Sequence, residues 1–429
     1  MGGQVHGPTE FIGVLICVKD FFQKNLFAMK NLVGMMVAMK KIIAFFIVFF
    51  AGAAFSAEFR TTAKSAFLLD FDSGAEIVAK SADELMPPSS MLKLMTLAVL
   101  FDEIRAGRLN LDDKLPVSRN ADYNDPRWYP ASKICLVAGQ EITVRDLILG
   151  LVVLSGGDAS VVVAEKIAGS EENFTQNMTR KAREIGMPLS TFGNASGLPH
   201  PDNLMTSREL ATLAYHLIAD YPDLYPMFAT KRFEFGDYKT DWCRDWGRTH
   251  TVNYNKLLFI MPGADGLKTG HTDSGGYGMV ASAISGGRRL IGVINGFRGR
   301  GHDALANEMK KLLNHGFTTT TTRVFYRPGD DILDVPVWYG RADSVSATVA
   351  KNFAVTVDKT VGIAGVRVLA RYSDPVAAPV RAGDVIGEVV AEQNGRVIAR
   401  GELVARENVR RVQLFGRVWR NIMVLIFGK

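Results

Sequence analysis

The stretch Pro88-Ser89-Ser90-Met91-Leu92-Lys93-Leu94-Met95-Thr96 holds the only Ser-x-x-Lys tetrad of the sequence. A serine hydroxyl is a weak nucleophile at its ordinary pKa, and a lysine one helical turn later on the same face can act as its base. The proline pair before it favours a helix start near Ser90, and an apolar-periodic helix is predicted from Lys93 to Ile104. Such a start directs free backbone N–H groups toward the Ser90 hydroxyl, as an oxyanion hole requires. The stretch predicts Ser90 as nucleophile and Lys93 as base.

Two further motifs follow in a fixed order. Ser155-Gly156-Gly157-Asp158 comes after a predicted helix, and Lys268-Thr269-Gly270, the only Lys-Thr-Gly of the chain, comes just before a predicted strand. This order matches the motif set of penicillin-binding proteins and class A β-lactamases. In that set Ser155 serves a proton relay, while Lys268 and Thr269 hold the substrate carboxylate. Gly270 lets an edge strand approach the ligand closely.

The chain resembles the D-alanyl-D-alanine carboxypeptidases, the low-molecular-mass penicillin-binding proteins, over nearly all residues from 39 to 429. Other stretches share the resemblance: Asn194-Ala195-Ser196-Gly197-Leu198, Asn255-Lys256-Leu257-Leu258 and Gly263-Ala264-Asp265-Gly266-Leu267-Lys268-Thr269-Gly270-His271-Thr272. The resemblance implies an enzyme that removes the terminal D-alanine from peptidoglycan stem peptides and that β-lactams acylate. It also implies residence at the periplasmic face of the inner membrane.

Two positions depart from the family pattern. The family's second motif is usually Ser-x-Asn, whose amide side chain holds the substrate's peptide group, and this chain has Gly157 there. A missing buried hydrogen bond costs ~1–3 kcal/mol if nothing replaces it. The family also tends to carry an arginine that binds the terminal carboxylate, and the matching position here is Leu305, with Arg298 and Arg300 nearby. Both departures affect how substrate is held, and neither affects activation of Ser90.

The alternation of helical and strand patterns predicts an α+β fold. Residues 61–322 are expected to form a β-lactamase/transpeptidase-like catalytic domain, an antiparallel sheet with helices. Short strands broken by turns predict a β-sandwich-like domain over 323–408, with a hairpin at Asn394-Gly395. Within the catalytic domain, strands are predicted at 65–72, 278–284 and 289–295, and further helices at 144–154, 159–167, 172–185 and 207–219.

The N-terminal residues 1–56 are predicted to form an extension and a signal peptide, the signal covering about 39–56. Lys40-Lys41 precedes the apolar run Ile42 to Phe50, which small residues follow. An uncleaved transmembrane helix is the alternative, although the run is shorter than the ~20 residues that a span needs. Residues 1–38 do not resemble a signal, and an upstream start codon would account for them.

Residues 409–429 are predicted to form an amphipathic helix that lies on the membrane surface. On a helix, one face carries Arg410, Gln413, Arg417, Arg420 and Asn421, while aromatic and aliphatic side chains share the other face. A helix docked on the protein's own core is the alternative. The formal net charge of +6 is concentrated at the two ends, and no basic patch with interleaved aromatics occurs between them. Nucleic acid is therefore not an expected partner.

The remaining reactive side chains give weaker signals. The histidines lack paired metal-ligand spacing, so neither a metal nor a cofactor is expected. His271 follows the Lys-Thr-Gly motif and is a candidate for lining the cleft, with a structural role as the alternative. Asp158 is predicted to be a helix N-cap rather than a proton carrier. Cys135 and Cys243 are either buried thiols or one disulfide.

Three other functions are compatible with these motifs. A β-lactamase shares the serine and lysine motifs, but the β-rich domain and the basic tail argue against it. A D,D-endopeptidase that cuts cross-bridges would use the same site on an internal bond. A non-catalytic peptidoglycan-binding scaffold is favoured only by Gly157 and the absent arginine.

Overall fold

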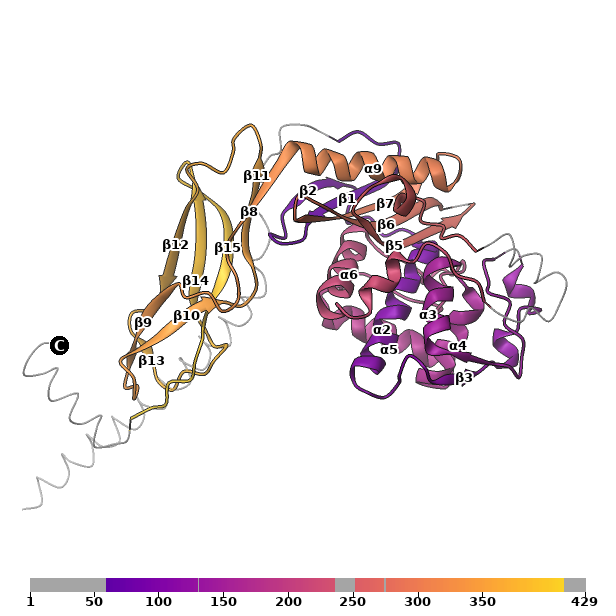
Figure 1. Ribbon diagram of the computed structural model, residues 1–429, viewed down its shortest axis with the longest axis horizontal. Coiled ribbons are helices and arrows are strands. Elements are labelled where there is room, and N and C mark those ends of the chain that lie inside the picture. Colours follow the sequence, from indigo (N-terminus) through magenta and orange to yellow (C-terminus); the bar gives the residue numbers. More distant parts are fainter. Residues whose placement is uncertain (1–58, 130, 236–250, 274, 413–429) are drawn as a thin grey trace, which may run out of the picture. The chain divides into compact units, whose positions relative to one another are not determined.

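Five strands, among them the predicted strand at 65–72, form one antiparallel sheet. In the computed structural model, which describes residues 59–129, 131–235, 251–273 and 275–412, the strand order is β2-β1-β7-β6-β5 (Figure 1). These strands are β1 (Ser65–Asp70), β2 (Glu76–Lys80), β5 (Ala264–Thr272), β6 (Gly276–Ser285) and β7 (Arg288–Phe297). All neighbouring pairs are antiparallel, and β5 is an edge strand that carries the Lys-Thr-Gly motif. The strand predictions and the edge position are confirmed.

The predicted helices are also present, within a few residues of their expected ends. They are α2 (Lys93–Arg105), α3 (Val144–Val153), α4 (Gly157–Ala168), α5 (Glu171–Glu184) and α6 (Ser207–Asp220). Side-chain hydroxyls of Thr143, Ser170 and Thr206 accept backbone N–H groups at the starts of α3, α5 and α6. These caps fix where each helix begins. The short elements are β3 (Lys114–Pro116), β4 (Glu141–Thr143), α8 (Leu257–Ile260) and the 3-10 turns η1 (Ser89–Leu92), η2 (Arg119–Ala121), η3 (Pro126–Trp128) and η4 (Tyr225–Ala229).

One long helix was not predicted. Helix α9 (Gly301–Thr319) follows β7, and its buried residues Leu305, Met309 and Leu312 have helical spacing. The glycines and threonines at its two ends obscured this signal. Helices α8 and α9 pack on one face of the sheet, where Leu68 and Met279 join their core, and helices α2 to α6 pack on the opposite face against Phe67 and Val280 (Figure 1). The sheet is therefore covered on both sides.

The region after α9 is all-β, as predicted. One sheet has the order β12-β14-β15-β10-β9-β13, and β8 pairs with β11 in another (Figure 1). Its strands are β8 (Thr320–Tyr326), β9 (Leu333–Trp338), β10 (Ser344–Val349), β11 (Phe353–Asp358), β12 (Arg367–Tyr372), β13 (Val376–Ala377), β14 (Val385–Gln393) and β15 (Arg396–Ala405). Asn394 and Gly395 have φ values of +52° and +74°, which confirms the predicted two-residue hairpin. Both sheets contribute to one apolar core.

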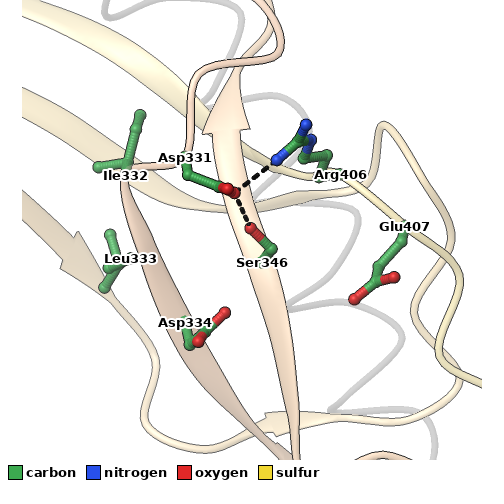
Figure 2. A pocket seen from close by; sticks show the side chains of 7 residues that line it. All are labelled: Asp331, Ile332, Leu333, Asp334, Ser346, Arg406 and Glu407. Atoms are coloured by element: carbon green, nitrogen blue, oxygen red, sulfur yellow. Dashed lines mark hydrogen bonds and ion pairs between the residues drawn. The ribbon is translucent and has the colours of Figure 1, made fainter.

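A polar surface hollow lies in this all-β region (Figure 2). Its lining residues are Asp331, Ile332, Leu333, Asp334, Ser346, Arg406 and Glu407. Asp331 Oδ1 accepts hydrogen bonds from Ser346 Oγ at 2.5 Å and from Arg406 Nη1 at 2.6 Å. None of these residues belongs to the three motifs, so the hollow is separate from the predicted active site.

The two predicted membrane-related segments fall outside the described residues. These are the extension and signal at 1–56 and most of the helix at 409–429, of which only Val409 to Val412 are described. Among the described residues, the structure contains no helix whose length and apolarity would let it cross a membrane. The domain boundaries predicted at 61, 322 and 408 stay predictions.

Candidate active site

Ser90 and Lys93 are hydrogen-bonded to each other. The η1 turn carries Ser90, and α2 begins at Lys93, so the predicted helix start near Ser90 is confirmed with a 3-10 first turn. Lys93 Nζ lies 2.9 Å from Ser90 Oγ. Ser90 is partly exposed, whereas Lys93 is buried. A ligand can therefore reach the hydroxyl while its lysine partner is shielded from water.

Burial changes the protonation of Lys93. It lowers the pKa of Lys93 from 10.5 to about 7, and the negative charges of Asp158 and Glu171 oppose this shift. Lys93 Nζ also donates to the carbonyl oxygen of Ser196, a residue of the Asn194–Leu198 stretch. A neutral amine beside a serine hydroxyl near pH 7 has the properties of a general base.

Ser155 joins α3 to α4 in an unusual backbone conformation. Its φ is +58°, in the left-handed region, and such strain at a non-glycine residue is frequent at functional sites. Ser155 Oγ is buried and has no hydrogen-bond partner among the described residues. An unsatisfied buried hydroxyl costs ~1–3 kcal/mol. This hydroxyl has free capacity for a proton-relay partner, the role predicted for Ser155.

The Lys-Thr-Gly strand lies directly against the turn that carries Ser90. A Cβ on Gly270 would lie 2.8 Å from the carbonyl oxygen of Pro88 and 3.1 Å from the backbone nitrogen of Met91. Ser89 Oγ also donates to Thr272 Oγ1 at 3.3 Å. Glycine at position 270 thus allows a close approach of β5 to the nucleophile turn, which brings the first and third motifs together. The sequence had suggested a close approach to the ligand instead.

Lys268 and Thr269 are both buried on β5. Lys268 Nζ donates to the carbonyl oxygen of Thr269 at 2.9 Å. Burial, and secondarily the charge of Lys93, hold the pKa of Lys268 well below its ordinary value. A carboxylate that bound here would favour the charged ammonium and would gain a strong ionic hydrogen bond.

An aromatic group that the sequence did not predict lies at the end of the Lys-Thr-Gly strand. The exposed His271 ring stacks on Tyr277 with centroids 4.0 Å apart, and Tyr277 meets the edge of His302 at 5.5 Å. His302 also stacks on Tyr254 at 5.2 Å, with 18° between the rings. His271 therefore lies at this end of the strand, but its contacts are with aromatic side chains. No local sequence signal marked Tyr254 or Tyr277.

His302 is the member of this cluster whose protonation is most strongly disfavoured. Burial lowers the pKa of His302 from 6.5 to about 4, and the positive charges of Lys268, His271 and Lys256 contribute to this shift. The negative charge of Asp303 opposes it. The Nδ1 of His302 is buried without a partner in the described part of the chain. Leu305, the position matched to the family's arginine, is fully buried in the core between α9 and the sheet. His302, one helical turn earlier on α9, is instead the residue whose pKa the charge of Lys268 lowers.

The His302 environment predicts an acid-sensitive contribution to stability. Because its pKa is lowered on folding, the unfolded chain binds more protons between pH 6.5 and 4, and stability falls as the pH drops through this window. When the pH is lowered from 7 to 4.5, the midpoint temperature of unfolding should fall less for His302→Asn than for the wild type. Thermal unfolding across this range measures the difference, and identical pH slopes for the two proteins would contradict it.

Asp158 differs from its predicted role. Helix α4 begins at Gly157 with Gly156 as N-cap, so Asp158 lies inside the first turn and is not the cap. Its carboxylate accepts the backbone N–H groups of Ile134 and Leu136 at 3.0–3.1 Å, as well as that of Ala159 at 2.9 Å. Asp158 uses its oxygens to hold a neighbouring segment, which is why it does not cap α4.

Metal and disulfide chemistry give two further results. Among the described residues no group of His, Cys, Asp and Glu could hold a metal ion. Cys135 is disulfide-bonded. Both other cysteines of the chain, Cys17 and Cys243, lie outside the described residues. Of the two alternatives for Cys135, the disulfide is therefore confirmed.

The α+β fold, together with a serine hydrogen-bonded to a buried lysine, indicates the class of serine hydrolases to which penicillin-binding proteins belong. The family model described as D-alanyl-D-alanine carboxypeptidase matches residues 52–298, and the model for the C-terminal domain of penicillin-binding protein 5 matches residues 317–411. The chain belongs to the D-alanyl-D-alanine carboxypeptidase family and is a serine-type carboxypeptidase, a hydrolase.

Curated relatives and solved structures agree over most of the chain. The D-alanyl-D-alanine carboxypeptidase DacC of Escherichia coli (strain K12) is 31% identical over 388 residues, which cover 88% of this chain and 93% of the relative. DacA of Haemophilus influenzae is 32% identical over 376 residues, with 86% and 90% covered. The crystal structure of penicillin binding protein 5 from Haemophilus influenzae has a TM-score of 0.73 at 30% identity and covers 83% of this chain and 99% of that one.

Proposed function

We propose that the Ser90 hydroxyl attacks the carbonyl carbon of the penultimate D-alanine while Lys93 Nζ accepts its proton. The bond to the terminal D-alanine then breaks, and the proton passes to the leaving amine with Ser155 Oγ as relay. Water hydrolyses the resulting ester and regenerates the Ser90 hydroxyl. The observation that carries this proposal is the 2.9 Å contact between Ser90 Oγ and a buried lysine whose pKa is lowered to about 7.

The substrate carboxylate is held by Lys268 and Thr269 on the edge strand. Gly270 allows this strand to lie against the Ser90 turn, which supports a carboxylate site beside the nucleophile. A carboxylate fixed on β5 places the last peptide bond, one residue away, within reach of Ser90. His271 lines the outer end of the strand. This arrangement explains why the enzyme would act at a chain end.

Covalent labelling by a β-lactam tests the nucleophile. Penicillin-binding protein D2 from Listeria monocytogenes, a structural neighbour with a TM-score of 0.51 and 25% identity, has been solved in an ampicillin-bound form. We expect a fluorescent penicillin to label the wild type and to leave Ser90→Ala unlabelled. Absence of label from folded wild-type protein would favour the non-catalytic scaffold, and label retained by Ser90→Ala would contradict the role of Ser90.

The enzyme acts on peptidoglycan at the periplasmic face of the inner membrane and is attached there by its C-terminal residues. Support comes from the sequence alone, namely the signal-like segment at 39–56 and the basic and aromatic stretch 409–429. A protein lacking residues 1–56 should sediment with anionic lipid vesicles, and a variant that also ends at Val412 should not. That end point retains the backbone bonds between Val409 and Val380. Equal sedimentation of both proteins would contradict attachment by the tail.

A further inference from the structure

Gly157 lies against the indole ring of Trp128, and no side chain fits between them. A Cβ built on Gly157 would lie 2.5 Å from Cζ3 and 2.9 Å from Cε3 of Trp128, closer than carbon atoms pack. Trp128 is fully buried, and densely packed surroundings leave a ring little space to move. The ring therefore occupies the place of a side chain at position 157.

The ring is held in this position by the segment that carries it. Arg127 Cζ lies 4.8 Å from the centroid of the Trp128 ring, and Lys133 Nζ donates to the Trp128 carbonyl oxygen at 2.6 Å. Gly157 in turn donates its backbone N–H to the carbonyl oxygen of Ser132 at 2.9 Å. The buried carboxylate of Asp158 holds the same segment two residues further on. Hydrogen bonds thus tie Trp128 to Lys133, and Ser132, Ile134 and Leu136 to the start of α4.

A peptide ligand brings amide N–H and C=O groups that lose water when they enter a cleft. An amide side chain at position 157 could pair with both kinds of group, because it carries donors and an acceptor. Glycine has no side-chain group for either pairing. The Trp128 ring offers no acceptor and one donor, its Nε1–H, which is buried and has no partner among the described residues. A ligand amide N–H left unpaired reduces affinity. Glycine in place of asparagine at position 157 should therefore change which ligands bind more than it changes the chemistry at Ser90.

We propose that Trp128 is a specificity-determining residue, because its ring takes the place of a hydrogen-bonding side chain at position 157. As a result, the cleft discriminates only weakly between acyl donors that have a flanking amide and acyl donors that lack one. The preferred ligands are those anchored by their carboxylate and their reacting carbonyl group. This inference rests on the proposed acylation of Ser90, and it deepens that proposal by describing the class of acyl donor.

Two β-lactams that differ in the flanking amide test the selectivity. Benzylpenicillin has an amide next to its ring, and 6-aminopenicillanic acid has an amine there. The ratio of their second-order acylation rate constants is the readout. We expect the double variant Trp128→Ala/Gly157→Asn to raise this ratio at least about tenfold over the wild type, the value of one hydrogen bond. Gly107→Asn, at a site with open space around it, is the matched control and should keep the wild-type ratio.

A stability cycle tests the packing of the ring independently of acylation. The loss of thermal stability on Gly157→Asn should be smaller when Trp128→Ala is already present, because the clash is then absent. Additive losses, or an unchanged acylation ratio in the double variant, would overturn the inference. If neither lactam acylates the folded wild type, the proposed function fails, and the stability cycle alone decides whether the ring occupies the side-chain site.

Discussion

Replacing Lys93 with methionine is expected to lower the acylation rate of Ser90 by a factor of about 10²–10⁴, the usual contribution of a positioned general base. Methionine has a similar length, and the site is buried, so the fold should be retained. Because the base acts only when deprotonated and its pKa is about 7, the wild-type acylation rate should rise between pH 6 and 8. Stopped-flow or quenched acylation with a penicillin across this range measures both effects.

A second buried lysine provides the control for this variant. Lys181 is buried on α5 and pairs with Asp102 at 2.7 Å, and it belongs to none of the three motifs. Lys181→Met should acylate with the wild-type pH profile, whatever it costs in stability. If Lys93→Met retained the wild-type rate and its rise near pH 7, another group would have to be the base.

Replacing Lys268 with methionine is expected to weaken binding of carboxylate-bearing ligands by about ten- to a hundredfold, the range for a charge-assisted hydrogen bond. The carboxylate contact exists before and during the reaction, so the effect should fall mainly on the saturation constant for acylation and less on the maximal rate. Measurement of the acylation rate against penicillin concentration separates these two quantities.

A methyl ester of the same penicillin is the matched ligand control for Lys268. The ester has no negative charge, so it should react poorly with the wild type, and Lys268→Met should reduce its reaction much less than that of the free acid. An equal loss for acid and ester would show that Lys268 supports the site without binding the carboxylate.

Local sequence patterns predicted the parts of the site that depend on short spacing. Ser90 and Lys93 are three residues apart, and their contact follows from one helical turn. The Lys-Thr-Gly segment was predicted as an edge strand, and β5 occupies that position. The order of the motifs, rather than any single motif, indicated that these segments belong to one site.

The missed features depend on contacts between distant segments. The Lys93 amine meets the Ser196 carbonyl across 103 positions of sequence, and Trp128 reaches Gly157 from a loop. The prediction that Asp158 caps α4 was wrong because its carboxylate binds the segment near Ile134 instead. Periodicity and propensity describe neighbours along the chain, so they cannot predict which loop a buried carboxylate or ring will meet.

The replacement at position 157 illustrates this limit. The sequence showed that the usual asparagine is absent, and it gave no indication of what fills the place. The structure shows a buried tryptophan ring there, in the place that a side chain at position 157 would take. The chemistry at Ser90 and the selectivity of the cleft can therefore vary separately in this chain.

Mass spectrometry of the purified protein incubated with a pentapeptide ending in D-Ala-D-Ala tests the central claim most directly. The wild type should release one D-alanine per peptide and leave a tetrapeptide, and Ser90→Ala should release none while keeping the wild-type unfolding temperature. Release by Ser90→Ala at the wild-type rate, or no release by folded wild-type protein, would contradict the account.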